Sequence, residues 1–259
     1  MKISIITVVY NNEDTIAECI ESVLSQTYQN IEYIIIDGNS TDGTKEKIKP
    51  YLERIDYFSS EPDSGIFDAY NKGITRATGD IVGVLNSDDF FYSEKTIEKI
   101  VKAFEVSGSD LVYGKGVFVS KENPEVVKRI YPSNRFKNSH LLFGWIPLHP
   151  TIYVKRKIYE EYGLYNKNYS IAGDYDISLR WFKNEQIEKF FLKDWIVKMR
   201  LGGKSTTLAL QKKKSSEDIK IIKYHKLAGY LTLIFKIGRK IPHHLIPRIV
   251  DSKNLYRWF

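Results

Sequence analysis

The sequence predicts an α/β protein with a doubly wound, mostly parallel sheet and a basic helical tail at the C-terminus. Short apolar runs rich in β-branched residues alternate with segments of helical periodicity over the first hundred residues. Single helices between successive strands imply crossover connections, which place the strands in parallel. The 259 residues, 42% of them apolar, suffice for one sizeable core.

The first strand is expected at residues 3–9, a continuous apolar run of the kind that is buried on both faces of a sheet. Asp14 or Thr15 can begin the next helix, whose apolar residues recur at helical spacing. The lone cysteine, Cys19, shares the apolar face of this helix, so we interpret it as a core residue. A second buried strand is expected at residues 31–36.

The alternation continues through three more strands. Residues 40–42 offer caps for a helix that runs to about residue 52. Helical spacing of apolar residues recurs at 65–77 and after Ser93. The strands expected between these helices are residues 56–59, 81–85 and 110–113.

The second half is less regular. Residues 117–119 and 126–131 are expected to form a hairpin. Residues 132–150 hold three of the eight prolines and both histidines outside the tail, which indicates an insertion that faces the substrate. Further helices are expected at 155–162 and 174–183, and a strand at 190–200.

Composition excludes collagen-like, disulfide-scaffold and disordered proteins, because glycine, proline and cysteine are too few and aromatic residues are ample. The net charge of +7 is uneven: residues 204–259 carry thirteen Lys/Arg against three Asp/Glu, which leaves the rest at −3. No stretch reaches the roughly 18–20 apolar residues that span a bilayer. We read the apolar N-terminal run as a strand instead of a signal peptide and expect a cytoplasmic protein.

Polar residues follow three of the expected strands, at 10–12, 37–43 and 86–89. Ligands of doubly wound sheets bind beyond these carboxyl ends. The adjacent carboxylates of Asp88 and Asp89 repel each other unless a cation or hydrogen bonds offset the cost. Hard oxygen ligands favour Mg²⁺ or Mn²⁺ shared with substrate phosphates. The structural alternatives are turns: Asp-Gly at Asp37, and a capped turn before residues 90–91.

Several sequence runs resemble the opening of family 2 glycosyltransferases, which have the GT-A fold; these runs are residues 3–11, 26–33, 37–44, 63–74, 77–80 and 85–89. The resemblance is closest to bacterial enzymes that build surface polysaccharides. It implies a GT-A domain at residues 1–205, with a nucleotide-binding part at 1–113 and an acceptor-side part at 114–205. A basic amphipathic helical tail is expected at residues 206–259.

The resemblance assigns these residues to the nucleotide-sugar donor: Thr7, Val9, Tyr10, Asp37, Asp68, Asn71, Lys72, Asn86 and Ser87. Asp37 would bind the base, and Asp88 would bind Mn²⁺ or Mg²⁺ as the last carboxylate of the family's Asp-x-Asp element. The chain departs from the family twice: Asn86 replaces the first carboxylate of that element, and Tyr70 stands where many members carry arginine.

The run at residues 169–176 resembles the family's Glu-Asp element at a helix start, with Gly173 in place of the glutamate. Asp174 then occupies the position of the catalytic base, and Asp176 is an acceptor-side candidate. An inverting transfer needs one such carboxylate near the acceptor hydroxyl. The alternative for both is helix N-terminal charge, which favours anions without any catalytic role.

Four further residues have two interpretations each. His149 and Trp145 lie in the irregular middle and are either acceptor-side contacts or structural residues. Gly202 and Gly203 form either a loop that closes over the diphosphate or a plain linker to the tail.

The expected function is that of an inverting, metal-dependent glycosyltransferase of the hexosyltransferase type. It moves a sugar from a nucleotide-sugar, expected to be a UDP-sugar, to a glycan or lipid-linked glycan in surface polysaccharide biosynthesis. The alternatives are a nucleotidyltransferase, or a non-catalytic module tethered to the membrane.

The basic tail has three interpretations. Lysines interleaved with apolar residues are typical of a helix on an anionic membrane surface, here the inner face of the cytoplasmic membrane. The same pattern fits a helix packed on the body with its lysines in water. A basic tail alone is only a weak indication of nucleic-acid binding.

Overall fold

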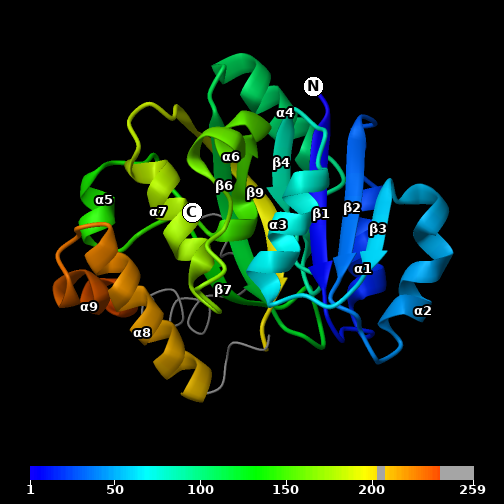
Figure 1. Ribbon diagram of the computed structural model, residues 1–259. Helices are drawn as coiled ribbons and strands as arrows, with labels where there is room; N and C mark the ends of the chain where they lie inside the picture. Colours follow the sequence, from blue (N-terminus) through cyan, green and yellow to red (C-terminus); the bar gives the residue numbers. More distant parts are fainter. Residues whose placement is uncertain (203–207, 240–259) are drawn as a thin grey trace.

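The computed structural model describes residues 1–202 and 208–239, and its strands form one sheet (Figure 1). The strands are β1 (Ile3–Val9), β2 (Ile31–Asp37), β3 (Tyr57–Ser60), β4 (Ile81–Val84), β5 (Phe90–Phe91), β6 (Leu111–Val119), β7 (Val127–Tyr131), β8 (Ile152–Lys155) and β9 (Lys189–Arg200). Their order is β3-β2-β1-β4-β8-β6-β9-β5, with β7 paired to β6. β5, β7 and β8 run against the other six, so the predicted mostly parallel sheet is confirmed.

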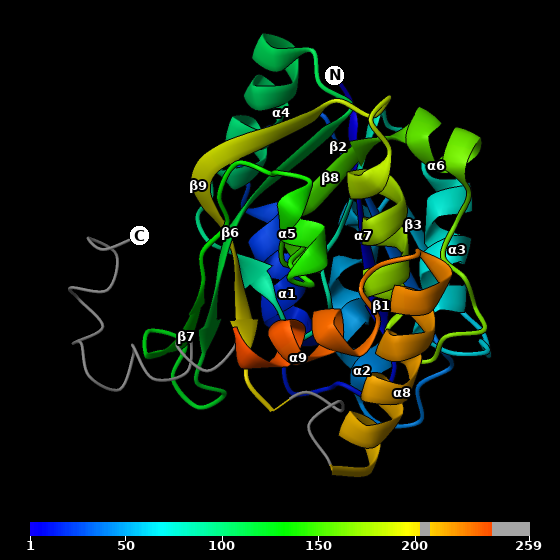
Figure 2. The ribbon, with the colours of Figure 1, turned by 90° about the vertical axis from the view of Figure 1, so that its left-hand side faces the viewer.

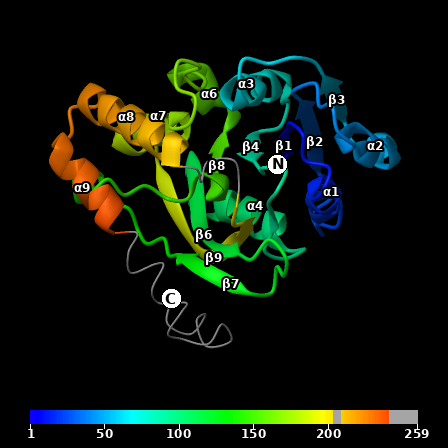
Figure 3. The same cartoon turned by 90° about the horizontal axis from the view of Figure 1, so that it is seen from below.

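Helices cover both faces of this sheet (Figure 3). Their bounds are α1 (Ile16–Leu24), α2 (Thr44–Ile48), α3 (Ile66–Arg76), α4 (Thr96–Ser107), α5 (Ser139–Leu142), α6 (Arg156–Tyr162), α7 (Gly173–Lys183), α8 (Leu208–Tyr224) and α9 (Tyr230–Gly238), with 3₁₀ turns η1 (Lys49–Arg54) and η2 (His149–Thr151). One apolar cluster lies under α3, α6 and α7, and a second lies under α1 and α4.

β1 shows why its sequence has no polar alternation. Ile6 and Val8 belong to the cluster under α3, whereas Ile3, Ile5 and Val9 belong to the cluster under α1 and α4. Successive side chains of a strand point to opposite faces. Because both faces are covered, β1 is buried along its whole length.

The structure differs from the sequence predictions in several places: β5 and α5 were not predicted, and two further differences concern the helix after residue 43 and β8. The helix expected to run to residue 52 is a short α-helix followed by η1, whose first turn contains Pro50, a residue that lacks the backbone N–H. β8 was not predicted, and it pairs antiparallel between β4 and β6. The hairpin expected near residues 117–131 is confirmed as the β6–β7 pair.

The described helices of the tail, α8 and α9, lie beside α7 (Figures 1 and 2). Ile221 and Ile222 of α8 are fully buried in the cluster under α7. Within residues 1–202 and 208–239, no helix is long and apolar enough to cross a membrane.

The amino-terminal edge of the sheet is tied by one buried carboxylate, that of Glu32 on β2. It accepts hydrogen bonds from Lys2 Nζ at 2.8 Å, from Ser4 Oγ at 2.5 Å, and from the Thr78 backbone N–H at 2.7 Å and hydroxyl at 2.5 Å. Burial alone would raise the pKa of Glu32, but these bonds lower it to about 2. The strand ends opposite this edge remain available for a site.

Glu32→Gln is expected to lower the free energy of unfolding by about 2 kcal/mol at pH 7, because it weakens charge-assisted hydrogen bonds. A carboxylate with a lowered pKa stabilises the fold above its unfolded-state pKa of about 4.3 and loses this effect as pH falls toward 2. Urea unfolding at pH 7, 4 and 3 should show the two proteins converging on acidification. Glu46→Gln, on the exposed side of α2, is the matched control; equal urea midpoints for wild type and Glu32→Gln at pH 7 would contradict the prediction.

Candidate active site

Three loops at the carboxyl edge of the sheet are joined by side-chain hydrogen bonds. The Asn11 N–H donates to Ser40 Oγ at 2.8 Å, and the Thr41 N–H donates to Asn11 Oδ1 at 2.8 Å. Asn12 Nδ2 donates to Ser87 Oγ at 2.9 Å. The loops after β1, β2 and β4 therefore form one continuous polar surface.

Asp37 ends β2 beneath this surface and is fully buried. Its carboxylate accepts hydrogen bonds from the Ser40 N–H at 3.0 Å, the Ser40 hydroxyl at 2.5 Å and the Ser60 hydroxyl at 2.6 Å. In this structure Asp37 therefore joins the loop after β2 to the end of β3.

The backbone of Gly38 is closely flanked on two sides. A Cβ atom at this position would lie 2.6 Å from Asp63 Oδ2 and 3.4 Å from Cδ2 of Tyr10. The Tyr10 side chain is 52% exposed, so its ring and the Asp63 carboxylate present a surface beside Asp37. Asp63 was not among the residues predicted for the site.

Thr7 and Val9 lie below this surface instead of on it. The Thr7 hydroxyl accepts a hydrogen bond from the Tyr33 hydroxyl at 3.1 Å and lies 3.8 Å from the sulfur of Cys19. The alternation of β1 directs this side chain toward α1, away from any ligand at the strand ends.

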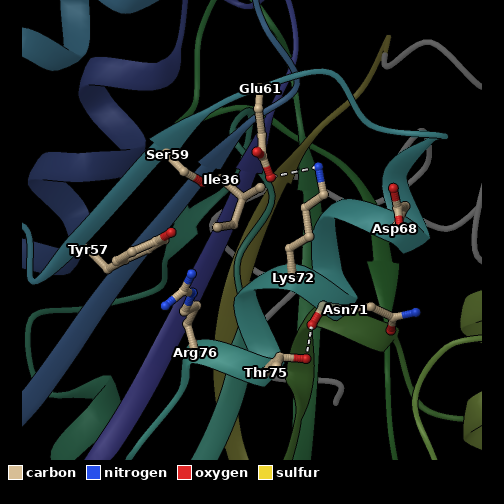
Figure 4. A pocket seen from close by; sticks show the side chains of 9 residues that line it. All are labelled: Ile36, Tyr57, Ser59, Glu61, Asp68, Asn71, Lys72, Thr75 and Arg76. Carbon is tan, nitrogen blue, oxygen red and sulfur yellow. Dashed lines mark hydrogen bonds and ion pairs between the residues drawn. The ribbon is translucent and has the colours of Figure 1, made fainter.

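A cavity of about 310 Å³ lies between β3 and α3 (Figure 4). Asp68 and Lys72 line it; Lys72 pairs with Glu61 at 3.0 Å. Asp68 accepts hydrogen bonds from the Ser64 N–H and from Lys167 Nζ, both at 3.0 Å, and these bonds lower its pKa. The carboxylates of residues 37, 88 and 174 do not line this cavity.

Asn71 also lines the cavity, but its amide is bonded on the far side of α3. Asn71 Nδ2 donates to the Tyr165 carbonyl, and the Tyr165 N–H donates to Asn71 Oδ1, each at 2.9 Å. The Asn71 side chain thus holds the backbone of Tyr165, which lies 94 residues further along the sequence.

The adjacent carboxylates after β4 have different environments. Asp89 is fully buried; Asn86 Nδ2 donates to it at 2.7 Å and the Arg200 N–H donates at 3.3 Å. Burial, reinforced by the charge of Asp88, raises the pKa of Asp89. Asp88 is partly exposed at the strand end. The Asn86 oxygen accepts a hydrogen bond from the Tyr70 hydroxyl.

Arg200, at the end of β9, closes this corner of the site and was not predicted. It is 6% exposed, donates to the Asp88 carbonyl at 2.9 Å and pairs with Glu18. Its position two residues before the glycine pair at 202–203 was the available signal. Gly202 has a φ of 105°, which favours glycine, and Gly203 lies outside the described residues.

A cluster of Tyr70, His149 and Tyr165 extends from Asn86 toward α7. His149 Nε2 lies 2.6 Å from the Tyr165 hydroxyl, and the Tyr70 ring lies 5.3 Å from the Tyr165 ring and 5.8 Å from the His149 ring. Burial, then the charges of Asp89, Asp174 and Asp88, raise the pKa of Tyr70. Tyr70 is therefore bonded to the loop that carries Asp88 and is near enough to Asp174 for the charge of that carboxylate to act on it.

Asp174 stands at the start of α7 and is partly exposed. Burial alone would raise its pKa, but the positive charges of Lys214, His149 and Lys236 outweigh burial and lower it. Gly173 explains the departure from the family motif: a Cβ atom there would lie 2.8 Å from the ring of Phe67 on α3, so a glutamate does not fit.

Two acceptor-side candidates contact other protein side chains: Asp176 is buried and Trp145 is partly buried. Asp176 is buried, lies 2.9 Å from His225 Nε2 and accepts a hydrogen bond from Arg180 at 3.2 Å. Trp145 packs edge-on against Tyr113 and His140. Of the three acceptor-side candidates, His149 is the one that belongs to the cluster with Tyr70 and Tyr165.

The donor set suits a cation held jointly with a substrate. The described parts of the chain contain no group of three or more His, Cys, Asp and Glu side chains that could hold a metal alone. Mg²⁺ and Mn²⁺ commonly take one or two carboxylates and complete their shell with substrate phosphates and water. Asp88, partly exposed beside the buried Asp89, fits the part of a single carboxylate ligand.

Comparison with known proteins identifies relatives over most of the chain. Residues 4–163 match the sequence profile described as Glycosyl transferase family 2. A Mycobacterium tuberculosis protein named PGL/p-HBAD biosynthesis glycosyltransferase is 28% identical over 260 residues, which are 98% of this chain and 96% of that protein. An uncharacterized glycosyltransferase of Rickettsia typhi is 28% identical over 212 residues, which are 79% of this chain but 65% of that protein.

Solved structures show the same fold. The structure of S. aureus TarS in complex with UDP-GlcNAc aligns with a TM-score of 0.71 at 20% identity, over 87% of this chain and 65% of that one. The mannosyltransferase PcManGT from Pyrobaculum calidifontis, in complex with GDP-Man and Mn²⁺, aligns with a TM-score of 0.63 at 18% identity, over 92% and 73%. These likenesses confirm the expected GT-A fold. Because the profile covers more than half of the sequence, the chain belongs to glycosyl transferase family 2 and is a glycosyltransferase.

Proposed function

We propose that this enzyme transfers a sugar, with inversion, from a UDP-sugar to a hydroxyl group of a glycan. The observation that supports the proposal is that α3 contacts both segments that carry the two candidate carboxylates: Tyr70 bonds to Asn86, two residues before Asp88, and Phe67 lies against Gly173, next to Asp174. Asp88 can help to hold the leaving diphosphate, and Asp174 can accept the proton of the attacking hydroxyl. Family membership favours this reaction over nucleotidyl transfer and over a non-catalytic module.

The donor lies along the carboxyl edge of the first four strands. Tyr10, Asp63 and the Gly38 backbone offer a surface for the base, with Asp37 directly beneath. TarS was solved with UDP-GlcNAc and PcManGT with GDP-Man, which supports a nucleotide-sugar as the donor class. The diphosphate then points toward Asp88 and the buried Arg200.

Asp88 would hold a divalent cation, Mn²⁺ or Mg²⁺, which would supply positive charge to offset the charge that develops on the leaving nucleoside diphosphate. Mn²⁺ in the PcManGT complex supports this choice. Asp174 has a lowered pKa and is ionised at neutral pH, so it can accept the proton of the acceptor hydroxyl. The acceptor oxygen bonds to the anomeric carbon while the bond from that carbon to the diphosphate oxygen breaks on the opposite face.

The acceptor is a glycan or lipid-linked glycan of surface polysaccharide biosynthesis, reached from the cytoplasmic side of the membrane. A relative named for PGL/p-HBAD biosynthesis supports a surface-glycan role. The basic charge of residues 204–259 supports an anionic membrane as a partner.

Asp174→Asn is expected to lower donor turnover by about 10²–10⁴-fold, because it removes the proton acceptor and keeps the side-chain shape. The donor is chosen by thermal shift from UDP-glucose, UDP-galactose, UDP-GlcNAc and GDP-mannose, since a bound donor raises the melting temperature. Release of the nucleoside diphosphate, with water as acceptor, is then measured. The donor-induced thermal shift should be unchanged, and Glu53→Gln on the exposed η1 turn serves as control. Unchanged turnover in Asp174→Asn would remove this residue from the mechanism.

Asp88→Asn is expected to raise the Mn²⁺ concentration for half-maximal release by at least about tenfold, because the cation loses its protein carboxylate. Asp89→Asn is the matched neighbour: its partners Asn86 and Arg200 lie within the protein, so it should change the melting temperature and not the metal requirement. Full activity of wild type after chelation, or equal metal titrations for both variants, would refute the role of Asp88.

A further inference from the structure

One carboxylate of the tail holds the backbone that leads into Asp174. Glu217, on α8, is 7% exposed and accepts four hydrogen bonds from residues 170–172. The donors are the Ser170 N–H at 3.0 Å, the Ser170 hydroxyl at 2.8 Å, the Ile171 N–H at 3.0 Å and the Ala172 N–H at 2.9 Å. Ala172 is the residue that caps α7, so Glu217 fixes the turn from which Asp174 projects.

The same face of α8 carries a lysine one helical turn earlier. Lys214 is 28% exposed at its side chain and lies 4.0 Å from Asp218, which in turn pairs with Lys236 of α9 at 2.8 Å. Residues three and four apart share a helix face, so Lys214, Glu217 and Asp218 all face α7. Between residues 214 and 218, the face of α8 that meets the body is therefore charged, and these charges lie near the start of α7; further along, the same helix buries Ile221 and Ile222.

We propose that α8 is a working part of the active site: Glu217 positions the backbone of Asp174, and Lys214 faces the Asp174 carboxylate as its main counter-charge. This inference rests on the proposed role of Asp174 as the base. It assigns to the tail a function in the transfer reaction itself, besides any contact that the tail makes with a membrane.

The groups around Asp174 differ in how well they can supply positive charge. Lys214 comes from α8, Lys236 from α9 and His149 from η2, while Tyr70 and Tyr165 face it as neutral phenols. Burial lowers the pKa of His149, and it lowers the pKa of Lys236 to about 7, so both lose charge near neutrality. Burial alone would also lower the pKa of Lys214, but Asp174, Asp218 and Glu217 raise it. Of these three groups, Lys214 is thus the one that keeps its positive charge at and above neutral pH.

The first test is the pH dependence of nucleoside diphosphate release by the full chain. Lys214→Met removes the charge and nearly keeps the length, so the acid limb of kcat/KM should move to higher pH. Lys214→Arg keeps the charge and should restore the wild-type limb. Lys212→Met, on the exposed side of the same helix, is the matched control and should leave the profile unchanged.

The second test separates positioning from mere stability. Glu217→Gln keeps the shape but loses the charge that receives four donors, so the turn before α7 loosens. A displacement of about 1 Å costs on the order of 10²-fold in rate, and we expect a loss of that size in kcat with the donor KM unchanged. Melting temperatures of all variants, with and without the donor, verify that the site is folded.

The outcomes distinguish the two proposals. If Asp174→Asn is inactive while Lys214→Met keeps the wild-type pH profile and Glu217→Gln keeps its kcat, α8 is only a structural support and the inference is wrong. The inference is also wrong if Lys212→Met shifts the profile as much as Lys214→Met, because the effect then reflects net charge. If Asp174→Asn itself is active, the proposed function fails first.

Discussion

A carboxylate removed from water costs several kcal/mol unless hydrogen-bond donors or cations replace the water. This constraint organises the carboxyl edge of the sheet. Asp37, Asp89, Asp176 and Glu217 are nearly inaccessible, and donors or a histidine from other segments compensate each of them. Each compensation joins distant parts of the chain: β2 to β3, β4 to β9, α7 to the end of α8, and α8 to the turn before α7. Most of the acidic residues around the site therefore have a structural role, because they hold its loops and helices together.

The same constraint distinguishes the carboxylates suited to chemistry. Asp88 and Asp89 are identical in type and adjacent in sequence, yet Asp89 is buried against Asn86 and Arg200 while Asp88 is partly exposed. Asp174 is kept ionised mainly by the cations around it. Because Asp174 is partly exposed, its charge costs less free energy than the charge of a fully buried carboxylate would. A base must be charged before the reaction and must also tolerate a proton after it. Several cations at a distance meet these two requirements better than one cation in a tight ion pair with the carboxylate.

The sequence predicted what depends on local periodicity. Most strands and helices of the first 113 residues follow from apolar spacing, with the exception of β5 and the end of the helix after residue 43, and the family motifs indicated the site. β8 was missed because a strand of four residues, directly after the irregular segment 132–150, is too short to show a period of its own. Side-chain direction and distant partners were also beyond reach: Thr7 turns into the core, Asn71 bonds to Tyr165, and Glu217 reaches back 45 residues to Ala172. No local pattern encodes such pairings, because they arise only when the chain is folded.

The described helices of the tail pack on the body, and α9 still presents a second face. α9 buries Thr232 and Lys236 against the body but exposes Tyr230, Leu231 and Ile234. Its buried face is partly polar because it completes the charged cluster around α7, and its outer face is apolar. An apolar outer face beside lysines is what an anionic membrane surface attracts. Packing on the body and contact with a membrane thus use different faces and do not compete. Membrane contact stays a prediction, but it would hold a lipid-linked acceptor close to the same helices that surround the base.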